Sequence, residues 1–215
     1  MDMIGVLDLQ GDVVEHIDHL NRLGIAGIRV KKPSDFAHLA GLIIPGGEST
    51  CLSRLLSIFG IREVILREFQ SGLKLWGTCA GAILLAEKVI GESPCLGLID
   101  IEIQKNAFGS QLDSFTTKSS VPLVAPRPIP LTFIRAPKIT RVGRDVDVLL
   151  RQDDYVAAAE SPDVLVTVFH PELTPSLAFH RYFALKCGLE PSMDEESSMI
   201  DPTWDNKSWT RYARL

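Results

Sequence analysis

The sequence contains few cysteines and no long hydrophobic run. Four of its 215 residues are cysteine, and no two form a Cys-x-x-Cys pair, so a disulfide framework is not expected. No apolar run reaches the roughly 18 residues that a membrane-spanning helix needs. Asp2, Asp8 and Asp12 interrupt the N-terminal segment and no basic region precedes it, which is unlike a secretory signal peptide. We therefore expect a cytoplasmic protein.

Basic residues are not concentrated in any part of the sequence, so nothing indicates a polyanionic partner. The 22 basic residues are scattered along the chain, and 27 acidic residues bring the net charge to −5. Without a basic stripe, neither nucleic acid nor an anionic membrane is an expected ligand. Hydrophobic residues make up 46% of the chain and charged residues 23%, which suits a globular protein with a sizeable core.

The length predicts one domain followed by a tail. We place the domain at residues 1–188, because no linker is recognisable before that point. Residues 189–215 are polar and at first acidic, and then include Trp204, Trp209 and Tyr212. Such a tail is either flexible or docks through its aromatic side chains on this domain or on a partner.

Apolar runs alternate with segments of helical spacing in the first half of the chain. Strands are predicted at residues 4–9, 28–30, 41–44 and 73–76, and helices at residues 13–23, 52–59, 61–70 and 80–89. Alternating strands and helices predict a parallel α/β sheet in three layers.

The second half of the chain reads differently. Residues 98–103 alternate between apolar and charged, and residues 116–131 hold four prolines and are predicted to be an irregular surface loop. Further strands are predicted at residues 132–134, 146–150, 156–159 and 164–169, with a helix at 177–185.

The stretch Gly77-Thr78-Cys79-Ala80-Gly81 stands where a strand meets a helix. A Gly-x-Cys-x-Gly pattern at such a junction is typical of a nucleophile elbow, in which a sharp turn projects the central side chain. The small flanking residues allow the strand and the helix to approach closely. The start of the next helix should favour the thiolate of Cys79.

A thiol nucleophile needs a base, and His170 is the best placed of the five histidines. It follows an apolar strand in the stretch Val-Phe-His-Pro-Glu-Leu, and ligands of open α/β sheets bind at the carboxyl ends of strands. Glu172 lies two residues further along and can orient the imidazole. Cys79, His170 and Glu172 thus have the residue types of nucleophile, base and orienting carboxylate.

A third element is a site for the negative charge that develops on a carbonyl oxygen under attack. The stretch Pro-Gly-Gly-Glu-Ser-Thr, residues 45–50, follows a strand and exposes backbone amides. The amides of Gly47 and Ala80 are the predicted oxyanion hole. The stretch lacks the lysine of a phosphate-binding loop. We expect no metal and no cofactor.

These motifs, in this order, resemble the class I glutamine amidotransferases, which use a catalytic triad. The closer resemblance is to the PdxT/SNO family, the glutaminase subunits of pyridoxal 5′-phosphate synthase. It rests on IGVLDLQGD, IIPGGEST, WGTCAGAILLA, KNAFGSQLDSF, FIRAP and VFHPELT, which span about residues 3–183. The resemblance implies a three-layer, flavodoxin-like α/β sandwich whose central sheet is mixed but mostly parallel.

The resemblance also implies a role for each matching position. Cys79, His170 and Glu172 would be the triad that hydrolyses L-glutamine to L-glutamate and ammonia through a thioester. The residues expected to contact glutamine are Gly47, Glu48, Ser49, Lys105, Ile134 and Arg135. Lys105 stands where the family usually has arginine, which predicts weaker glutamine binding because a planar fork is lost. Ser110 stands where many relatives have arginine.

A glutaminase of this kind implies an acceptor for its ammonia. The family implies a (β/α)₈ synthase subunit as partner in a hetero-oligomer, and activity that depends on that partner. Gln10 follows the first strand and is either near the ammonia exit or a turn residue. The alternatives are a glutaminase subunit of another ammonia-channelling synthase, an amidase or cysteine peptidase of related fold, and a non-catalytic regulatory subunit with weakened glutamine binding.

Overall fold

A computed structural model of the chain describes residues 2–105 and 114–200. In this part of the chain, ten strands form one twisted sheet in the order β2-β1-β3-β4-β12-β11-β9-β6-β5, with β10 paired to β11. Two further strands, β7 and β8, form a separate antiparallel pair. No helix in these residues is long and apolar enough to cross a membrane.

The first five strands of that order pair in parallel, as the run of alternating strands and helices predicts. Beyond β12 the pairings with β11, β9 and β6 are antiparallel, and β5 and β6 are again parallel. The mixed, mostly parallel sheet is therefore confirmed. The strands are β1 (Met3–Leu7), β2 (Gly27–Val30), β3 (Leu39–Ile44), β4 (Lys74–Thr78), β5 (Ala86–Val89), β6 (Ile99–Gln104), β7 (Ser114–Ser119), β8 (Ile129–Ile134), β9 (Lys138–Val142), β10 (Asp147–Gln152), β11 (Tyr155–Glu160) and β12 (Val164–Thr167).

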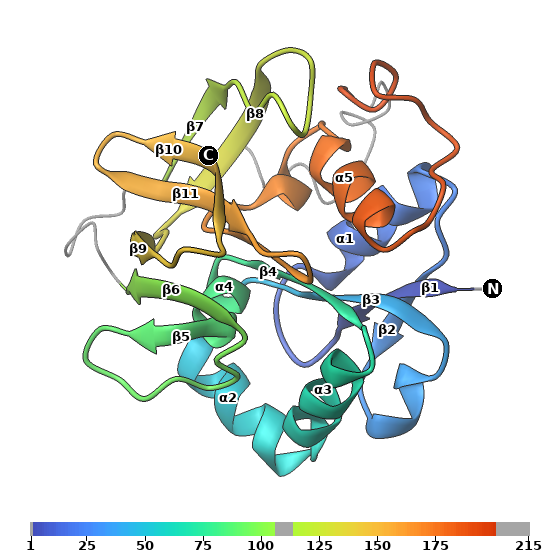
Figure 1. Cartoon of the computed structure of the whole chain (residues 1–215). Helices are drawn as coiled ribbons and strands as arrows, with labels where there is room; N and C mark the ends of the chain where they lie inside the picture. Colours follow the sequence, from blue (N-terminus) through green and yellow to red (C-terminus); the bar gives the residue numbers. More distant parts are fainter. Residues whose placement is uncertain (1, 106–113, 201–215) are drawn as a thin grey trace.

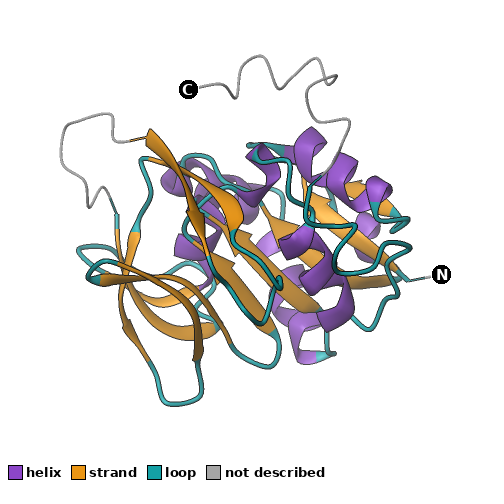
Figure 2. Ribbon diagram, turned by 90° about the horizontal axis from the view of Figure 1, so that it is seen from above, coloured by secondary structure: helices purple, strands orange, loops and turns teal. Residues whose placement is uncertain are grey.

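Helices cover both faces of the parallel part of the sheet (Figure 1). On one side lie α1 and α5, and on the other lie α2 and α3, with α4 packed against α2. Figure 2 shows the same layers from above, with the strands between the helices on one side of the molecule and the mostly strand-built part on the other. The helices are α1 (Val13–Arg22), α2 (Ser49–Ile58), α3 (Ile61–Gln70), α4 (Ala80–Leu85) and α5 (Ala178–Lys186), with short 3-10 turns η1 (Pro33–Phe36) and η2 (Pro171–Leu173).

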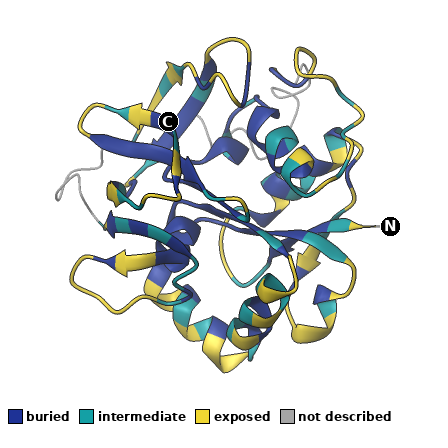
Figure 3. Ribbon diagram, viewed as in Figure 1, coloured by how far each residue is buried: buried dark blue, intermediate teal, exposed yellow. Residues whose placement is uncertain are grey.

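The central strands are mostly apolar, as expected for strands that helices cover on both faces. The four residues of β12 and the last four of β3 are all buried, and Figure 3 shows the buried residues concentrated in these strands. By contrast β6 alternates between buried and partly exposed residues, as its alternating sequence predicts.

Two predictions of secondary structure are wrong. The helix predicted at residues 80–89 ends at Leu85, and Ala86–Val89 is a strand that pairs in parallel with β6. The loop predicted at residues 116–131 contains most of β7 and the start of β8. Apart from Phe115 the side chains of β7 are polar, and all six residues are partly or fully exposed, so they carry no apolar alternation that could have revealed a strand.

The first part of the predicted tail lies against the domain. The amide of Ser192 donates to the carbonyl of Leu23 at the end of α1, and the amide of Leu177 donates to the carbonyl of Ser198. Met199 is buried against the core. The three aromatic residues of the tail, at positions 204, 209 and 212, lie outside the described residues, and the boundary at residue 188 stays a prediction.

Candidate active site

The loops at the carboxyl ends of four neighbouring parallel strands meet at one edge of the sheet. Gln10 follows β1, Gly47 follows β3, Cys79 follows β4 and His170 follows β12. In open α/β sheets this edge is where ligands bind. The fold therefore brings together segments that are as much as 160 positions apart in the sequence, counting from residue 10 to residue 170.

Cys79 occupies the turn between β4 and α4 with strained backbone angles. Its φ is 48° and its ψ is −104°, a conformation that residues with a side chain rarely adopt and that recurs at functional sites. The Cys79 amide donates to the carbonyl of Thr167 at 2.8 Å, which ties the turn to β12. The side chain is 8% exposed.

The two glycines around Cys79 are needed for close packing. A Cβ atom on Gly77 would lie 2.5 Å from the backbone of Gly81, and one on Gly81 would lie 1.9 Å from the carbonyl oxygen of Ile44. Any larger residue at either position would push β4, α4 and β3 apart. The elbow predicted from the Gly-x-Cys-x-Gly pattern is thus present in the described structure.

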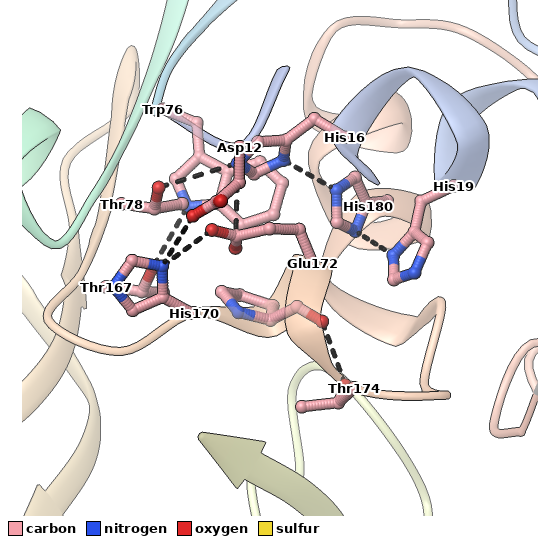
Figure 4. Close-up of polar contacts among 11 residues, drawn as sticks. Asp12, His16, His19, Trp76, Thr78, Thr167, His170, Glu172, Thr174 and His180 are labelled. Atoms are coloured by element: carbon pink, nitrogen blue, oxygen red, sulfur yellow. Dashed lines mark hydrogen bonds and ion pairs between the residues drawn. The ribbon is translucent and has the colours of Figure 1, made fainter. Parts of the chain in front are cut away.

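His170 is held on both its backbone and its ring. Its amide donates to the carbonyl of Thr132 at 2.8 Å, and its Nδ1 atom lies 2.7 Å from Oε1 of Glu172 (Figure 4). Glu172 sits in the 3-10 turn η2 and is completely buried. Because Nδ1 faces a carboxylate, it carries the proton, and Nε2 is left as the basic atom of the neutral ring.

The electrostatic surroundings of His170 favour its protonated form. Burial alone lowers the pKa of His170, but the carboxylate of Glu172, the sulfur of Cys79 and the carboxylate of Asp12 together raise that pKa well above its ordinary value. Cys79 and His170 line the same cavity, and a Cβ atom built on Gly46 would lie close to both side chains. The residues predicted as nucleophile, base and orienting carboxylate therefore lie together at this edge of the sheet, with His170 bonded to Glu172 and electrostatically coupled to Cys79.

A second carboxylate beside His170 escaped the sequence analysis. Oδ2 of Asp12 lies 3.5 Å from the His170 Nδ1 atom, and hydrogen bonding to His170 lowers the pKa of Asp12 despite its partial burial. Asp12 precedes α1, where we considered it only as a charge that interrupts an apolar segment. Its position after the first strand, at the edge that carries the other loops, was the available signal.

These residues border a cavity of about 770 Å³. Nine of the ten predicted site residues line it; the tenth, Glu172, is buried behind His170. The lining includes Gly47, Glu48, Ser49, Cys79, Ala80, Lys105, Ile134, Arg135 and His170, together with Gln10, Asp12 and Glu15. A volume of this size accommodates a small polar substrate with room for water.

The loop after β3 is arranged more specifically than its sequence indicates. The Glu48 carboxylate accepts hydrogen bonds from the amides of Thr50 at 3.0 Å and Cys51 at 2.6 Å, so it caps α2. These bonds lower the pKa of Glu48. The Glu48 amide donates to Oε1 of Gln10 at 3.2 Å. A Cβ atom on Gly46 would lie 2.5 Å from Cε1 of His170, so only glycine fits there.

Lys105 and Arg135 approach the cavity from other strands. Lys105 follows β6, and its ammonium group pairs with the carboxylate of Glu92 at the cavity wall. Arg135 follows β8 with a φ of 44°, another strained backbone position at this site. Residues 106–113, which include Ser110, lie outside the described residues.

The arrangement suits nucleophilic attack by sulfur on an acyl carbon. Cys79, His170 and Glu172 lie in the order in which a thiol, a base and an orienting carboxylate act. Ligand atoms of Asp12, His170 and Glu172 also lie within 4.8 Å of one another, a spacing that a metal ion could bridge. A metal there would displace the short bond between His170 and Glu172, so the geometry fits a hydrogen-bonded triad better.

A family model for the SNO glutamine amidotransferase family matches residues 6–189. The chain is 59% identical over 210 residues to "Pyridoxal 5′-phosphate synthase subunit PdxT" of Syntrophus aciditrophicus (strain SB), covering 98% of this chain and 94% of that protein. It is 48% identical over 185 residues to the protein of the same name from Clostridium botulinum (strain Loch Maree / Type A3), covering 85% of this chain and 96% of that protein.

Solved structures resemble the fold as well. A crystal structure titled as a glutamine amidotransferase superposes with a TM-score of 0.82 at 41% sequence identity, covering 87% of this chain and all of the other. A structure titled PurLQS from Thermotoga maritima superposes with a TM-score of 0.64 at 16% identity, which supports the fold alone.

Proposed function

The chain belongs to the SNO glutamine amidotransferase family, and on this premise we propose that it is the glutaminase subunit of a pyridoxal 5′-phosphate synthase. It would hydrolyse L-glutamine to L-glutamate and ammonia at the site described above. The observation that supports this most directly is that Cys79 and His170 line one cavity while the Nδ1 atom of His170 is bonded to Glu172. The alignments with the two relatives that carry the synthase name cover 94% and 96% of the length of those proteins.

The proposed reaction begins with attack of the Cys79 thiolate on the side-chain carbonyl carbon of glutamine. The electron pair of the carbonyl moves to its oxygen, where the amides of Gly47 and Ala80 would stabilise the negative charge. His170, as imidazolium, then donates its Nε2 proton to the departing nitrogen. Collapse of the intermediate breaks the bond from carbon to nitrogen and leaves a γ-glutamyl thioester and ammonia.

The second half-reaction regenerates the enzyme with water. Neutral His170 removes a proton from a water molecule, which attacks the thioester carbon. The bond from carbon to sulfur breaks, glutamate leaves, and the thiolate and imidazolium are restored. Throughout, Glu172 would hold the ring in the tautomer that presents Nε2 to the substrate.

The cavity offers groups for both ends of glutamine. Lys105 would attract the α-carboxylate, after giving up its pairing with Glu92. Ile134, Arg135 and Ser49 would complete the binding pocket from the loops that line it. Glu48 would act mainly through its backbone, because its carboxylate already caps α2.

We propose further that the ammonia passes to a synthase subunit of (β/α)₈ fold. Ammonia released into water at neutral pH is protonated and loses its nucleophilicity. A partner that takes ammonia up directly from the glutaminase site would keep it unprotonated and able to react. The intact group of Cys79, His170 and Glu172 argues against a purely regulatory subunit.

Glutamate release from glutamine, measured with and without the cognate synthase subunit, tests the proposed function. We expect release that rises strongly when the synthase is added and that Cys79→Ala abolishes without unfolding the chain. Lack of glutamate release with the synthase present, or undiminished release by Cys79→Ala, would contradict the proposal.

A further inference from the structure

Three completely buried histidines form a chain of contacts that ends at Glu172 (Figure 4). His16 Nδ1 lies 2.8 Å from Nε2 of His180, and Nδ1 of His180 lies 3.1 Å from Nδ1 of His19. His16 and His19 are one turn apart on α1, and His180 comes from α5. At the other end, His16 Nε2 lies 3.5 Å from Oε2 of Glu172.

Glu172 needs this contact because its second oxygen is otherwise unsatisfied. Oε1 is bonded to His170, but Oε2 is buried and has no hydrogen-bond partner at ordinary distance among the described residues. A buried carboxylate oxygen without a donor is costly. His16 is the side chain whose nitrogen faces Oε2, and the Oγ1 atom of Thr78 lies 3.5 Å from the same nitrogen.

The negative charge of Glu172 determines which nitrogen donates and which accepts in each contact between the three histidines. A neutral imidazole has one N–H donor and one acceptor nitrogen, and burial lowers the pKa of both His16 and His180. A carboxylate only accepts, so the proton of His16 belongs on Nε2. Its Nδ1 must then accept from Nε2–H of His180, and Nδ1 of His180 must accept from Nδ1–H of His19. The reverse pattern would set a lone pair of His16 against the carboxylate.

We propose that His16 is a positioning residue for the triad, acting through Glu172, and that His180 and His19 hold His16 in the tautomer that donates to this carboxylate. The inference rests on the proposed function, because it assigns a role to a group that supports the base of that reaction. It adds a hydrogen-bonded path from α5 and α1 to the orienting carboxylate. By holding the Glu172 carboxylate in place, the three histidines would keep its Oε1 atom on Nδ1 of His170.

Packing alone is the alternative role for these histidines. The rings of His16 and His180 lie edge-on to the indole of Trp76, with centroids 5.6 Å and 4.8 Å away. An apolar side chain of similar size would preserve such packing, whereas support of Glu172 requires a donor. The two roles therefore predict different results for substitutions of equal size.

The test compares His16→Leu, which removes the donor, with His16→Gln, whose side-chain amide places an N–H near the position of Nε2. Both are assayed for glutamate release with the synthase subunit. For His16→Leu we expect kcat to fall roughly 10- to 100-fold with little change in KM, and the alkaline limb of the pH profile to move to lower pH. His16→Gln should recover most of both losses. Equal behaviour of the two variants, or a wild-type profile for His16→Leu, would overturn the proposal.

The shift of the alkaline limb follows from the groups around Glu172. Those that face it are His170 from its own turn, Asp12 from the residue before α1, and Glu15 and His16 from α1. Without the His16 donor, Oε2 of Glu172 has no partner among the described residues that would hold the carboxylate against Nδ1 of His170. A weaker bond to Glu172 stabilises the His170 imidazolium less, so the imidazolium would lose its proton at lower pH.

A second measurement does not depend on activity or on a variant that must fold. Nitrogen-15 NMR of the histidine rings in the wild-type chain reports which nitrogen carries the proton. We expect Nε2–H for His16 and His180 and Nδ1–H for His19. The opposite tautomers would overturn the inference even if the glutaminase is active, and a wild type that releases no glutamate would instead contradict the proposed function.

Discussion

The Nδ1 atom of His170 lies 2.7 Å from Oε1 of Glu172, a carboxylate two positions along the chain that is completely buried. The turn between them is stiffened by Pro171 and is a short 3-10 helix. A buried carboxylate fixed so close to the ring both sets the tautomer of His170 and stabilises its protonated form. The consequences of this pairing can be measured one residue at a time.

Glu172→Gln should lower kcat for glutamine hydrolysis roughly 10²- to 10⁴-fold, because the ring loses both its orientation and its counter-charge. KM should change little, since Glu172 does not line the cavity. Glu160→Gln is the matched control, because Glu160 is another buried carboxylate, paired with Lys186 and absent from the cavity lining. Similar values of kcat for the two variants would argue against a special role for Glu172.

Asp12→Asn should move the alkaline limb of the pH profile to lower pH. The Asp12 carboxylate is one of the groups that raise the pKa of His170, so its loss makes the imidazolium more acidic. The measurement is kcat/KM for glutamine across the pH range, with Asp145→Asn, a change at an exposed carboxylate in the turn before β10, as control. An alkaline limb that stays in place or moves upward would show that Asp12 does not act on His170.

Lys105→Arg should lower KM for glutamine. A guanidinium group can bind the α-carboxylate through two parallel hydrogen bonds, whereas the ammonium group offers a point charge and is paired with Glu92. Lys118→Arg on the exposed strand β7 is the control. A KM that is unchanged or raised by Lys105→Arg would count against Lys105 as the carboxylate-binding residue.

The free energy of unfolding should fall as the pH drops below about 6.5, the ordinary pKa of histidine. Burial lowers the pKa of His16 and His180, so below that pH the unfolded chain binds protons that the folded chain cannot. Each histidine adds a slope of up to about 1.4 kcal/mol per pH unit. The pKa of His170 is raised, so the contribution of His170 to the free energy of unfolding changes only above that pH. It does not obscure the slope expected below it.

Urea unfolding at a series of pH values between about 6.5 and 5.5 measures that slope. His180→Gln should make it shallower, whatever its effect on stability at neutral pH. His38→Gln, which removes an exposed histidine, is the control. An unchanged slope in His180→Gln would mean that His180 is not held neutral in the folded chain.

The sequence was sufficient to predict the parts of the fold and site that depend on local patterns. The elbow at Cys79 follows from two glycines around a thiol at a junction between strand and helix, and the structure shows why each glycine is needed. The pairing of His170 with Glu172 is likewise local, because two residues in one turn cannot move far apart.

The parts that were missed depend on tertiary pairing. Residues 86–89 continue an apolar helical pattern, yet they form β5 because β6 offers them a parallel partner. Pro130 argued for a loop, but it lies opposite Lys118 in a strand that, among the described residues, has a partner on one side only, where proline is tolerated. His16 and His180 meet across 164 positions, so no sequence window could have joined them.

The central claim is that the Cys79 sulfur attacks the side-chain carbon of glutamine. Labelling the chain, in complex with its synthase subunit, with a glutamine analogue that carries an electrophile at that carbon tests it most directly. We expect one label per chain, on Cys79 and not on the exposed Cys51, with glutaminase activity lost in proportion and glutamine protecting against both. Activity that survives complete labelling of Cys79, or that is lost as another residue is labelled, would contradict the claim.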